Sequence, residues 1–254
     1  MTEPHSPASL WDKNWETYRA EHKLENTSEI ITCLSALNLN SQTRILEVGA
    51  GTGGDSATLS RFGAQVVCLD FSAQAVQLVA ENARALQAPL LPVRGDAWTL
   101  PFRDDSFDVI FHQGFLEHFR EPMALVEEQV RVLKPGGYLL VDVPQRYTLY
   151  ALKKFYRVHT GRWFAGWERS FSIFELRRIA EKFNLAVAGE YGRGYSPHIL
   201  HHLRYMQGLW SHKMLGGPRL RQINDTCWGW IEQTTLAKLY LNNIGALYQK
   251  NDTA

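Results

Sequence analysis

Residues 44–54 read RILEVGAGTGG, and this stretch decides the fold expected of the chain. The apolar run 45–48 predicts a buried parallel strand, and the glycines that follow predict a tight turn into a helix. Because glycine lacks a Cβ and tolerates positive φ, the backbone of such a turn can lie directly against a ligand. The stretch therefore predicts a strand, turn and helix that together hold a nucleotide-like cofactor.

Two cofactor classes fit the spacing of the glycines. Gly49, Gly51 and Gly54 satisfy the dinucleotide fingerprint G-x-G-x-x-G, a weak signal when it stands alone. Gly49, Gly51 and Gly53 satisfy G-x-G-x-G, and Glu47 precedes them at the end of the strand. A carboxylate there repels a pyrophosphate but suits the ammonium group of S-adenosylmethionine. With Glu47, the turn resembles motif I of the class I S-adenosylmethionine-dependent methyltransferases.

Two later segments resemble the same family, in the order that the family has them. LPF, SFD and LEH within residues 100–118 resemble the small-molecule subgroup that includes quinone-biosynthesis methyltransferases. The segment 132–144, VLKPGGYLLVDVP, resembles the motif that follows the next helix. The amino-methyltransferase signature, Asp or Asn followed by Pro-Pro and an aromatic residue, is absent after the fourth strand. The resemblance covers residues 44–144 and disfavours N-methylation of adenine or glutamine.

The resemblance implies an α/β fold with a Rossmann-like sheet of seven strands, the last antiparallel, flanked by helices. Residues 1–43 are expected to form a helical segment over the cofactor site, and residues 44–144 the S-adenosylmethionine-binding core. Residues 145–254 would complete the sheet, with residues 242–250 as its last strand. Substrate-binding insertions are expected at 145–170 and 193–240, the second of them helical and aromatic.

Cofactor contacts follow from motif position and from the ends of the predicted strands. Asp70 ends the second strand, roughly 20 residues beyond the glycines, where an acid accepts hydrogen bonds from ribose hydroxyls. Asp96 and Ala97 end the third strand and suit the adenine amine and a ring nitrogen, while Phe71 can pack on the adenine face. The full set of predicted cofactor residues is Glu47, Gly49, Ala50, Gly51, Gly53, Asp70, Phe71, Asp96, Ala97 and Gln113.

Catalysis by methyl transfer depends chiefly on alignment and a dry pocket, because the sulfonium is already a strong electrophile. His118 is the candidate general base, since histidine titrates near neutrality and this one follows the fourth strand. The same position also suits a residue that merely orders a loop. The residues predicted to contact the acceptor are Tyr147, Trp163, Trp167, Arg193, His198, His201 and Arg204.

No metal site is expected, although three histidines show helical ligand spacing. His198, His201 and His202 stand at i, i+3 and i+4, but no nearby acid or cysteine completes a zinc set. The three cysteines of the chain are widely spaced and show neither metal nor redox spacing. They indicate reduced thiols and a cytoplasmic protein.

The charges of the two halves differ, although the net charge is only +1. Residues 1–150 hold 12 Lys and Arg against 19 Asp and Glu, and residues 151–254 hold 15 against 7. The basic half suits an anionic or lipid-borne acceptor, an anionic membrane surface, a dimer contact, or a solvated face without further role. Nucleic acid is not expected as a partner, because no known RNA-binding module is visible and the first half is acidic.

The function predicted from the sequence is transfer of a methyl group from S-adenosylmethionine to a small molecule, with O- or C-methylation favoured. Two alternatives stay open. A nicotinamide-dependent oxidoreductase would share the glycines and Asp70 but leaves Glu47 and Asp96 unexplained. A protein that binds S-adenosylmethionine without catalysis would share every cofactor motif.

Overall fold

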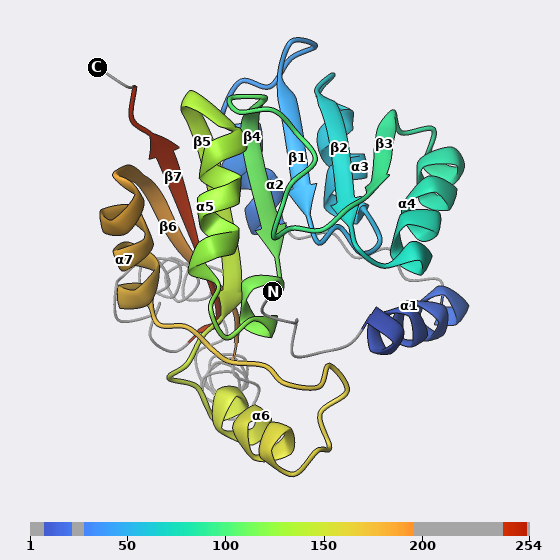
Figure 1. Cartoon of the computed structure of the whole chain (residues 1–254), viewed down its shortest axis with the longest axis vertical. Helices are drawn as coiled ribbons and strands as arrows, with labels where there is room; N and C mark the ends of the chain where they lie inside the picture. The colour runs from blue at the N-terminus through green and yellow to red at the C-terminus, as the bar shows by residue number, and fades with distance from the viewer. Residues whose placement is uncertain (1–7, 22–27, 196–240, 253–254) are drawn as a thin grey trace, which may run out of the picture.

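The computed structural model describes residues 8–21, 28–195 and 241–252, and its centre is a seven-stranded sheet (Figure 1). The strands stand in the order β3-β2-β1-β4-β5-β7-β6. All neighbours are parallel except the pairs made by β7, which runs antiparallel to both β5 and β6. The strands are β1 (Arg44–Val48), β2 (Gln65–Asp70), β3 (Leu90–Arg94), β4 (Phe107–Gln113), β5 (Leu133–Pro144), β6 (Leu185–Tyr195) and β7 (Leu241–Lys250). The predicted fold class is confirmed.

Helices cover both faces of the sheet and bury two separate cores. One core lies under α5 and α7 and includes Leu46, Ile110 and Leu176. The other lies under α2, α3 and α4 and includes Ile45, Phe111 and Val79. Neighbouring strand residues therefore face opposite cores, as the two-residue period of a strand requires. The helices are α1 (Ala8–Glu21), α2 (Ser28–Ser35), α3 (Gly54–Ser60), α4 (Ala73–Leu86), α5 (Met123–Val132), α6 (Leu149–His159) and α7 (Ile173–Phe183), with a 3-10 turn, η1 (Leu116–His118).

Side-chain caps fix the beginnings of three helices. Ser72 accepts from the backbone N–H of Ala75 at 3.2 Å and so begins α4. Thr148 accepts from Ala151 at 3.0 Å and begins α6. Ser172 and Glu175 have the S-x-x-E spacing from which the sequence predicts a capping box, and they form one at the start of α7, with the Glu175 carboxylate accepting from the Ser172 N–H at 2.9 Å.

The structure departs from the sequence-based expectations in three segments. Pro135, Gly136 and Gly137 are residues typical of a turn, yet β5 begins before them at Leu133, which pairs with Phe107 across a bulge in the β4–β5 ladder. Residues 149–159 form a helix inside the segment predicted only as an insertion. Strand β6 continues to Tyr195, so that Arg193 lies in the sheet and not in the second insertion. Residues 196–240 lie outside the described residues.

A buried carboxylate joins the three strands at the antiparallel edge of the sheet. Asp142 of β5 accepts two bonds from the Arg193 guanidinium of β6, at 2.9 and 2.7 Å, and one from the Tyr191 hydroxyl at 2.9 Å. Asn243 of β7 donates to the same carboxylate at 3.3 Å. We call these four residues the Asp142 cluster. Its two β6 side chains cross β7 to reach β5, and Tyr191 does so directly over Gly245.

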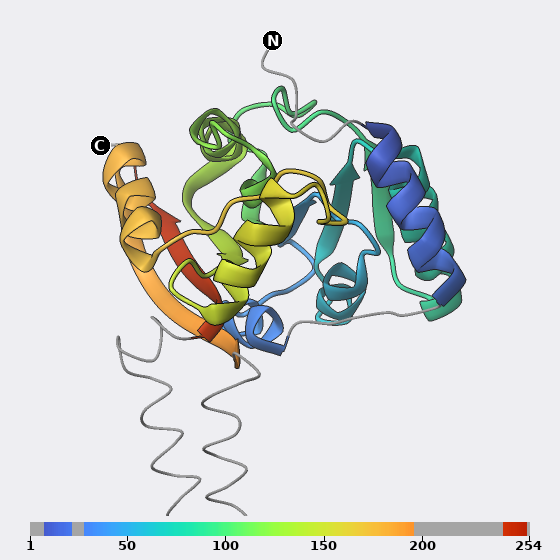
Figure 2. The ribbon, with the colours of Figure 1, turned by 90° about the horizontal axis from the view of Figure 1, so that it is seen from below.

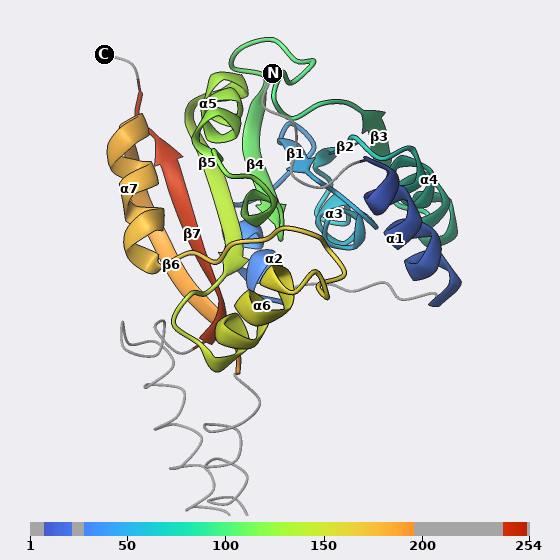
Figure 3. The same ribbon diagram turned by 60° about the horizontal axis from the view of Figure 1, so that its bottom comes forward.

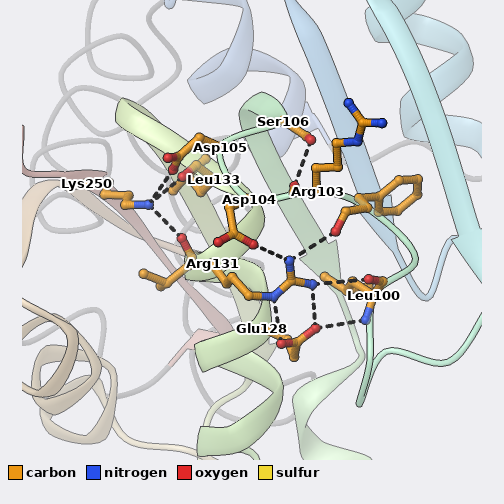
Figure 4. Close-up of polar contacts among 11 residues, drawn as sticks. Leu100, Arg103, Asp104, Asp105, Ser106, Glu128, Arg131, Leu133 and Lys250 are labelled. Carbon is orange, nitrogen blue, oxygen red and sulfur yellow. Dashed lines mark hydrogen bonds and ion pairs between the residues drawn. The ribbon is translucent and has the colours of Figure 1, made fainter.

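A second polar network holds the loop between β3 and β4 (Figure 4). The Arg131 guanidinium binds Glu128 with two hydrogen bonds, at 2.9 and 2.8 Å, and Asp104 at 2.6 Å. It also donates to the carbonyl oxygens of Leu100 and Phe102. All of these partners except Glu128 belong to the loop, so one guanidinium fixes the segment that follows Asp96.

Among the described residues, no helix combines the length and the apolar character that crossing a bilayer requires. The longest helices there, α1 and α4, have 14 residues each.

Replacing Arg131 by Gln should lower the free energy of unfolding by about 2 kcal/mol, since a hydrogen bond to a charged group contributes roughly 1.5–3 kcal/mol. Urea unfolding followed by circular dichroism measures the change. Arg103→Gln, on the same loop but with an exposed side chain, is the matched control and should cost no more than about 0.5 kcal/mol. Equal effects of the two variants would contradict the role given to Arg131.

Replacing Gly245 by Ala should destabilise the protein by roughly 1–3 kcal/mol through overpacking. A Cβ at this position would overlap the Tyr191 ring and would push that side chain off Asp142. In a Tyr191→Ala background the cost should vanish, so a double-mutant cycle in urea should show strong coupling. Gly189→Ala is the control, because its Cβ would meet nothing within 4 Å. Additive effects of the two changes would show that the overlap with Tyr191 does not govern the Gly245 position.

Candidate functional site

The glycine turn after β1 has the backbone shape that only glycine takes without strain. Gly49, Gly51 and Gly53 have φ values of 70°, 52° and 68°. Two aromatic rings lie where side chains would otherwise stand. A Cβ on Gly49 would lie 2.7 Å from the Phe115 ring, and one on Gly51 would lie 2.5 Å from the Trp15 ring. The turn is therefore a narrow cradle with an aromatic wall.

Asp70 joins this turn to the one that follows β2. One carboxylate oxygen accepts from the Gly51 N–H at 3.0 Å, and the other accepts from the Ser72 N–H at 2.9 Å. The side chain is buried, and burial raises its pKa while the backbone hydrogen bonds lower it. Each oxygen retains a second lone pair, which suits the two hydroxyls of a ribose.

Glu47 lies buried at the end of β1, beneath the glycine turn. The Ser56 hydroxyl at the start of α3 donates to its carboxylate at 2.5 Å. Burial raises its pKa well above the ordinary value, the nearby Asp55 carboxyl raises it further, and the Ser56 bond opposes both. A carboxyl in this setting gains most from a cationic partner, which an ammonium group would supply.

The remaining predicted cofactor residues lie along the same edge of the sheet, because β1 to β4 are parallel and end together. Asp96 is exposed and accepts from the Trp98 N–H, while Ala97 beside it is buried. Phe71 and Gln113 are half-buried at the ends of β2 and β4. This edge of the sheet therefore fits a nucleoside that carries an ammonium group. It presents the carboxylates of Glu47 and Asp70, the glycine turn, and the exposed Asp96 beside the buried Ala97.

The N-terminal helix α1 contacts this edge at three points. Trp15 lies on Gly51, and Asp12 accepts from the Ser72 hydroxyl at 2.5 Å. Trp11 packs its ring edge-on against His118, with ring centroids 4.7 Å apart. Figure 2 shows α1 beside α4 at the β3 end of the sheet. That residues 1–43 cover the cofactor site remains a proposal, which these contacts support.

Two buried groups in η1 each carry a polar atom without a protein partner among the described residues. They are the Oε2 atom of Glu117 and the Nδ1 atom of His118. Burial raises the pKa of Glu117 well above its ordinary value, with the nearby Glu168 carboxyl adding to it. Burial also lowers the pKa of His118. The imidazole is therefore uncharged at neutral pH and able to accept a proton.

Next to η1 lies a buried ion pair that the sequence did not predict. Lys154 of α6 and Glu168 are 2.5 Å apart, with side chains only 2% and 6% exposed. Lys154 also donates to the Arg169 carbonyl, and the Trp163 indole donates to Glu168. The Arg169 N–H in turn donates to the Glu117 carbonyl at 2.9 Å, which joins this pair to η1. The segment 163–169 and α6 are thus fixed against the end of β4.

A cavity of about 960 Å³ opens between α6 and residues 167–170. Its wall includes Tyr147 and Trp167, two of the predicted acceptor residues, together with Lys154 and Glu168. Trp163 does not line the cavity, but its indole N–H donates a hydrogen bond to Glu168, which does. The Arg120 guanidinium lies 5.2 Å from the Trp167 ring centroid. Arg193 is not in the wall, since Asp142 binds its guanidinium. His198, His201 and Arg204 lie outside the described residues.

The sequence offered unequal signals for the residues that it did not assign to the site. Trp11 and Trp15 stand four residues apart on a helix, a spacing that already places them on one face. Lys154 and Glu168 offered no signal, because their pairing depends on how α6 folds back along the chain. Among the described residues, no cluster of His, Cys, Asp and Glu could hold a metal ion.

Comparison with known proteins agrees with this geometry. The family described as "Methyltransferase domain" matches residues 46–141. A demethylmenaquinone methyltransferase of Beutenbergia cavernae is 34% identical over 149 residues, which make up 55% of this chain and 58% of that protein. The enzyme of the same name from Clavibacter sepedonicus is 42% identical over 98 residues, covering 39% and 40%. This chain spans less than two thirds of the length of both relatives.

Solved structures show the same fold over most of the chain. A SAM-dependent methyltransferase from Methanosarcina mazei superimposes with a TM-score of 0.59 and covers 87% of this chain and 98% of its own, at 18% identity. At that identity the likeness establishes the fold alone. The matched domain includes β1, its glycine turn and Asp70, which are the residues that carry the cofactor prediction. Residues 46–141 therefore match a methyltransferase domain, and the sheet is the one that the resemblance to the class I S-adenosylmethionine-dependent methyltransferases implies, a family whose cofactor is S-adenosylmethionine.

Proposed function

We propose that this protein transfers a methyl group from S-adenosylmethionine to a small-molecule acceptor held in the cavity between α6 and residues 167–170. The observation that supports the acceptor's place is the cavity of about 960 Å³ whose wall contains Lys154 and Glu168, the pair joined to η1. The glycine turn, Glu47 and Asp70 would hold the cofactor. O- or C-methylation is favoured, and the mixed apolar and charged wall suits an anionic or lipid-borne acceptor.

The residues of this chain would act mainly by position. S-adenosylmethionine supplies the electrophilic methyl group when it is bound. A hydroxyl acceptor would also have to lose a proton. His118 is the proposed proton acceptor, because burial, which lowers its pKa, keeps the imidazole uncharged at neutral pH, and its Nδ1 atom has no partner in the described part of the chain. Trp11 and Trp15 would exclude water from the cofactor edge.

Free thiols at Cys33 and Cys68 agree with the reduced, cytoplasmic setting that the sequence predicts. We include that location in the proposal. A relative named demethylmenaquinone methyltransferase makes demethylmenaquinone one candidate acceptor to assay.

The proposal is tested by binding and turnover together. Calorimetry should show binding of S-adenosylhomocysteine and none of NAD. Labelled S-adenosylmethionine incubated with a small-molecule extract should then transfer its label to an extract component. NAD binding without a response to S-adenosylhomocysteine would favour the oxidoreductase alternative. Cofactor binding without label transfer to any supplied acceptor would favour the non-catalytic alternative.

Replacing Asp70 by Asn should weaken S-adenosylhomocysteine binding by roughly 10- to 150-fold, because a hydrogen bond to a charged group contributes about 1.5–3 kcal/mol. Asn keeps the shape of the side chain, and its one carbonyl oxygen can still accept a hydrogen bond from one of the two turns that Asp70 joins. Calorimetry measures the affinity, and a thermal melt without ligand checks the fold. Unchanged affinity in a folded variant would reduce Asp70 to a turn residue.

Binding of S-adenosylhomocysteine should release a proton from Glu47. Since its pKa is raised, the free protein holds this proton above the ordinary carboxyl range, and an ammonium partner favours the charged form. Affinity should therefore rise with pH, up to about tenfold per unit, and level off above the raised pKa. The folded chain binds the proton more tightly than the unfolded chain does, so Glu47 costs stability as pH rises through the same window.

Calorimetry in buffers of different ionisation enthalpy counts the protons released. Glu47→Gln should bind more weakly and lose this release, whereas Glu127→Gln, an exposed residue of α5, should match the wild type. Proton release that persists in Glu47→Gln would assign the titration to another group.

A further inference from the structure

Exposed apolar side chains are concentrated in one short segment of the described chain. The described part of the chain exposes ten large hydrophobic residues, and six of these lie between positions 147 and 164. The six are Tyr147, Leu149, Leu152, Phe155, Tyr156 and Phe164, with exposed fractions from 48% to 67%. A contiguous apolar patch on a protein surface usually marks a binding surface.

Helix α6 carries four of these exposed side chains. Leu149, Leu152 and Tyr156 stand at helical spacing, and Phe155 adjoins them. The opposite side buries Ala151 and Lys154. An ordinary surface helix exposes mainly polar side chains, whereas this one exposes leucine and aromatic side chains. We call Leu149, Leu152, Phe155 and Tyr156 the outer stripe of α6.

Cations flank the outer stripe, and acids are absent from the segment. Lys153 and Arg157 are exposed one helical turn apart, and Arg162 is exposed just beyond the helix. Residues 147–167 contain no Asp or Glu. The charge of Lys154 is neutralised by Glu168 inside the protein, so the positive charge that faces solvent comes from the flanking residues.

The outer stripe lies where an acceptor would have to enter. Figures 1 and 3 show α6 beyond the carboxyl ends of the parallel strands, at one end of the described molecule. Leu149, Leu152 and Phe155 also line the cavity of about 960 Å³. A surface covering the stripe would therefore cover the rim of that cavity.

We propose that α6 docks its outer stripe on an anionic phospholipid bilayer. Aliphatic and aromatic side chains with flanking cations are the composition of helices that lie in a membrane interface. A symmetric second copy fits less well, because it would bring Lys153 and Arg157 of both copies together. Single-stranded nucleic acid fits less well too, because Leu149 and Leu152 offer no stacking surface.

Sedimentation of the full chain with lipid vesicles tests this proposal without any assay of methyl transfer. The protein should bind vesicles of phosphatidylcholine mixed with phosphatidylglycerol, and it should bind far less to vesicles of phosphatidylcholine alone. Added salt should release it from the anionic vesicles. Lys153→Gln with Arg157→Gln should weaken partition about 25-fold, since one cation near an anionic surface contributes about fivefold. Leu152→Glu should abolish binding.

Matched controls separate the surface from a general effect of charge or polarity. Arg178→Gln with Lys182→Gln removes two exposed cations from α7, and Leu91→Glu alters an equally exposed leucine on β3. Both controls should bind as the wild type does, and all variants should keep S-adenosylhomocysteine binding as the check on the fold.

Three results would overturn the proposal. One is failure of the wild-type chain to bind anionic vesicles, and another is binding that Leu152→Glu leaves intact. The third is a dimer, seen by light scattering, that Leu152→Glu dissolves, because that would assign the stripe to a second copy. None of these results depends on whether the protein transfers a methyl group.

Discussion

The site depends on one buried carboxylate that joins two turns. Asp70 accepts from Gly51 after β1 and from Ser72 after β2, so the ends of two neighbouring strands are fixed relative to each other. Ser72 also begins α4 and binds Asp12 of α1. Asp70 and Ser72 together therefore hold the glycine turn, helix α4 and the N-terminal helix α1 in place. A charged group can take this position only because backbone N–H groups offset part of the cost of its burial.

The parts of the molecule that the sequence predicted are those that depend on local chemistry. The strand and glycine turn of residues 44–54 are fixed by apolar side chains and by positive φ, and the capping box of α7 by two residues three apart. Asp70 follows from its place at a strand end. The sheet of seven strands with an antiparallel last strand was predicted because the family motifs occur along the chain in the family's order.

The parts that the sequence did not predict depend on contacts between distant segments. Arg193 appeared to be a free cation for an acceptor, yet β6 brings it across β7 to Asp142, 51 residues away in the chain. The LKPGG segment looks like a turn, but pairing with Phe107 draws Leu133 into β5. Helix α6 exposes leucine and aromatic side chains beside Lys153 and Arg157, so its sequence did not show the apolar-in, polar-out pattern from which surface helices are recognised.

Ion pairs within the fold also explain why the basic C-terminal half does not present a uniformly positive surface. The C-terminal half is basic by count, but many of its described cations are paired with acids: Lys154 with Glu168, Arg169 with Glu175, Arg177 with Glu190, Arg193 with Asp142 and Lys250 with Asp105. These pairs position strands and helices, and they leave little field for steering an anionic acceptor from solution. In the segment 147–167 the exposed cations instead lie beside exposed leucine and aromatic side chains. Charge placed there acts over one Debye length at a surface, so it favours contact with an extended anionic layer over capture of a free anion.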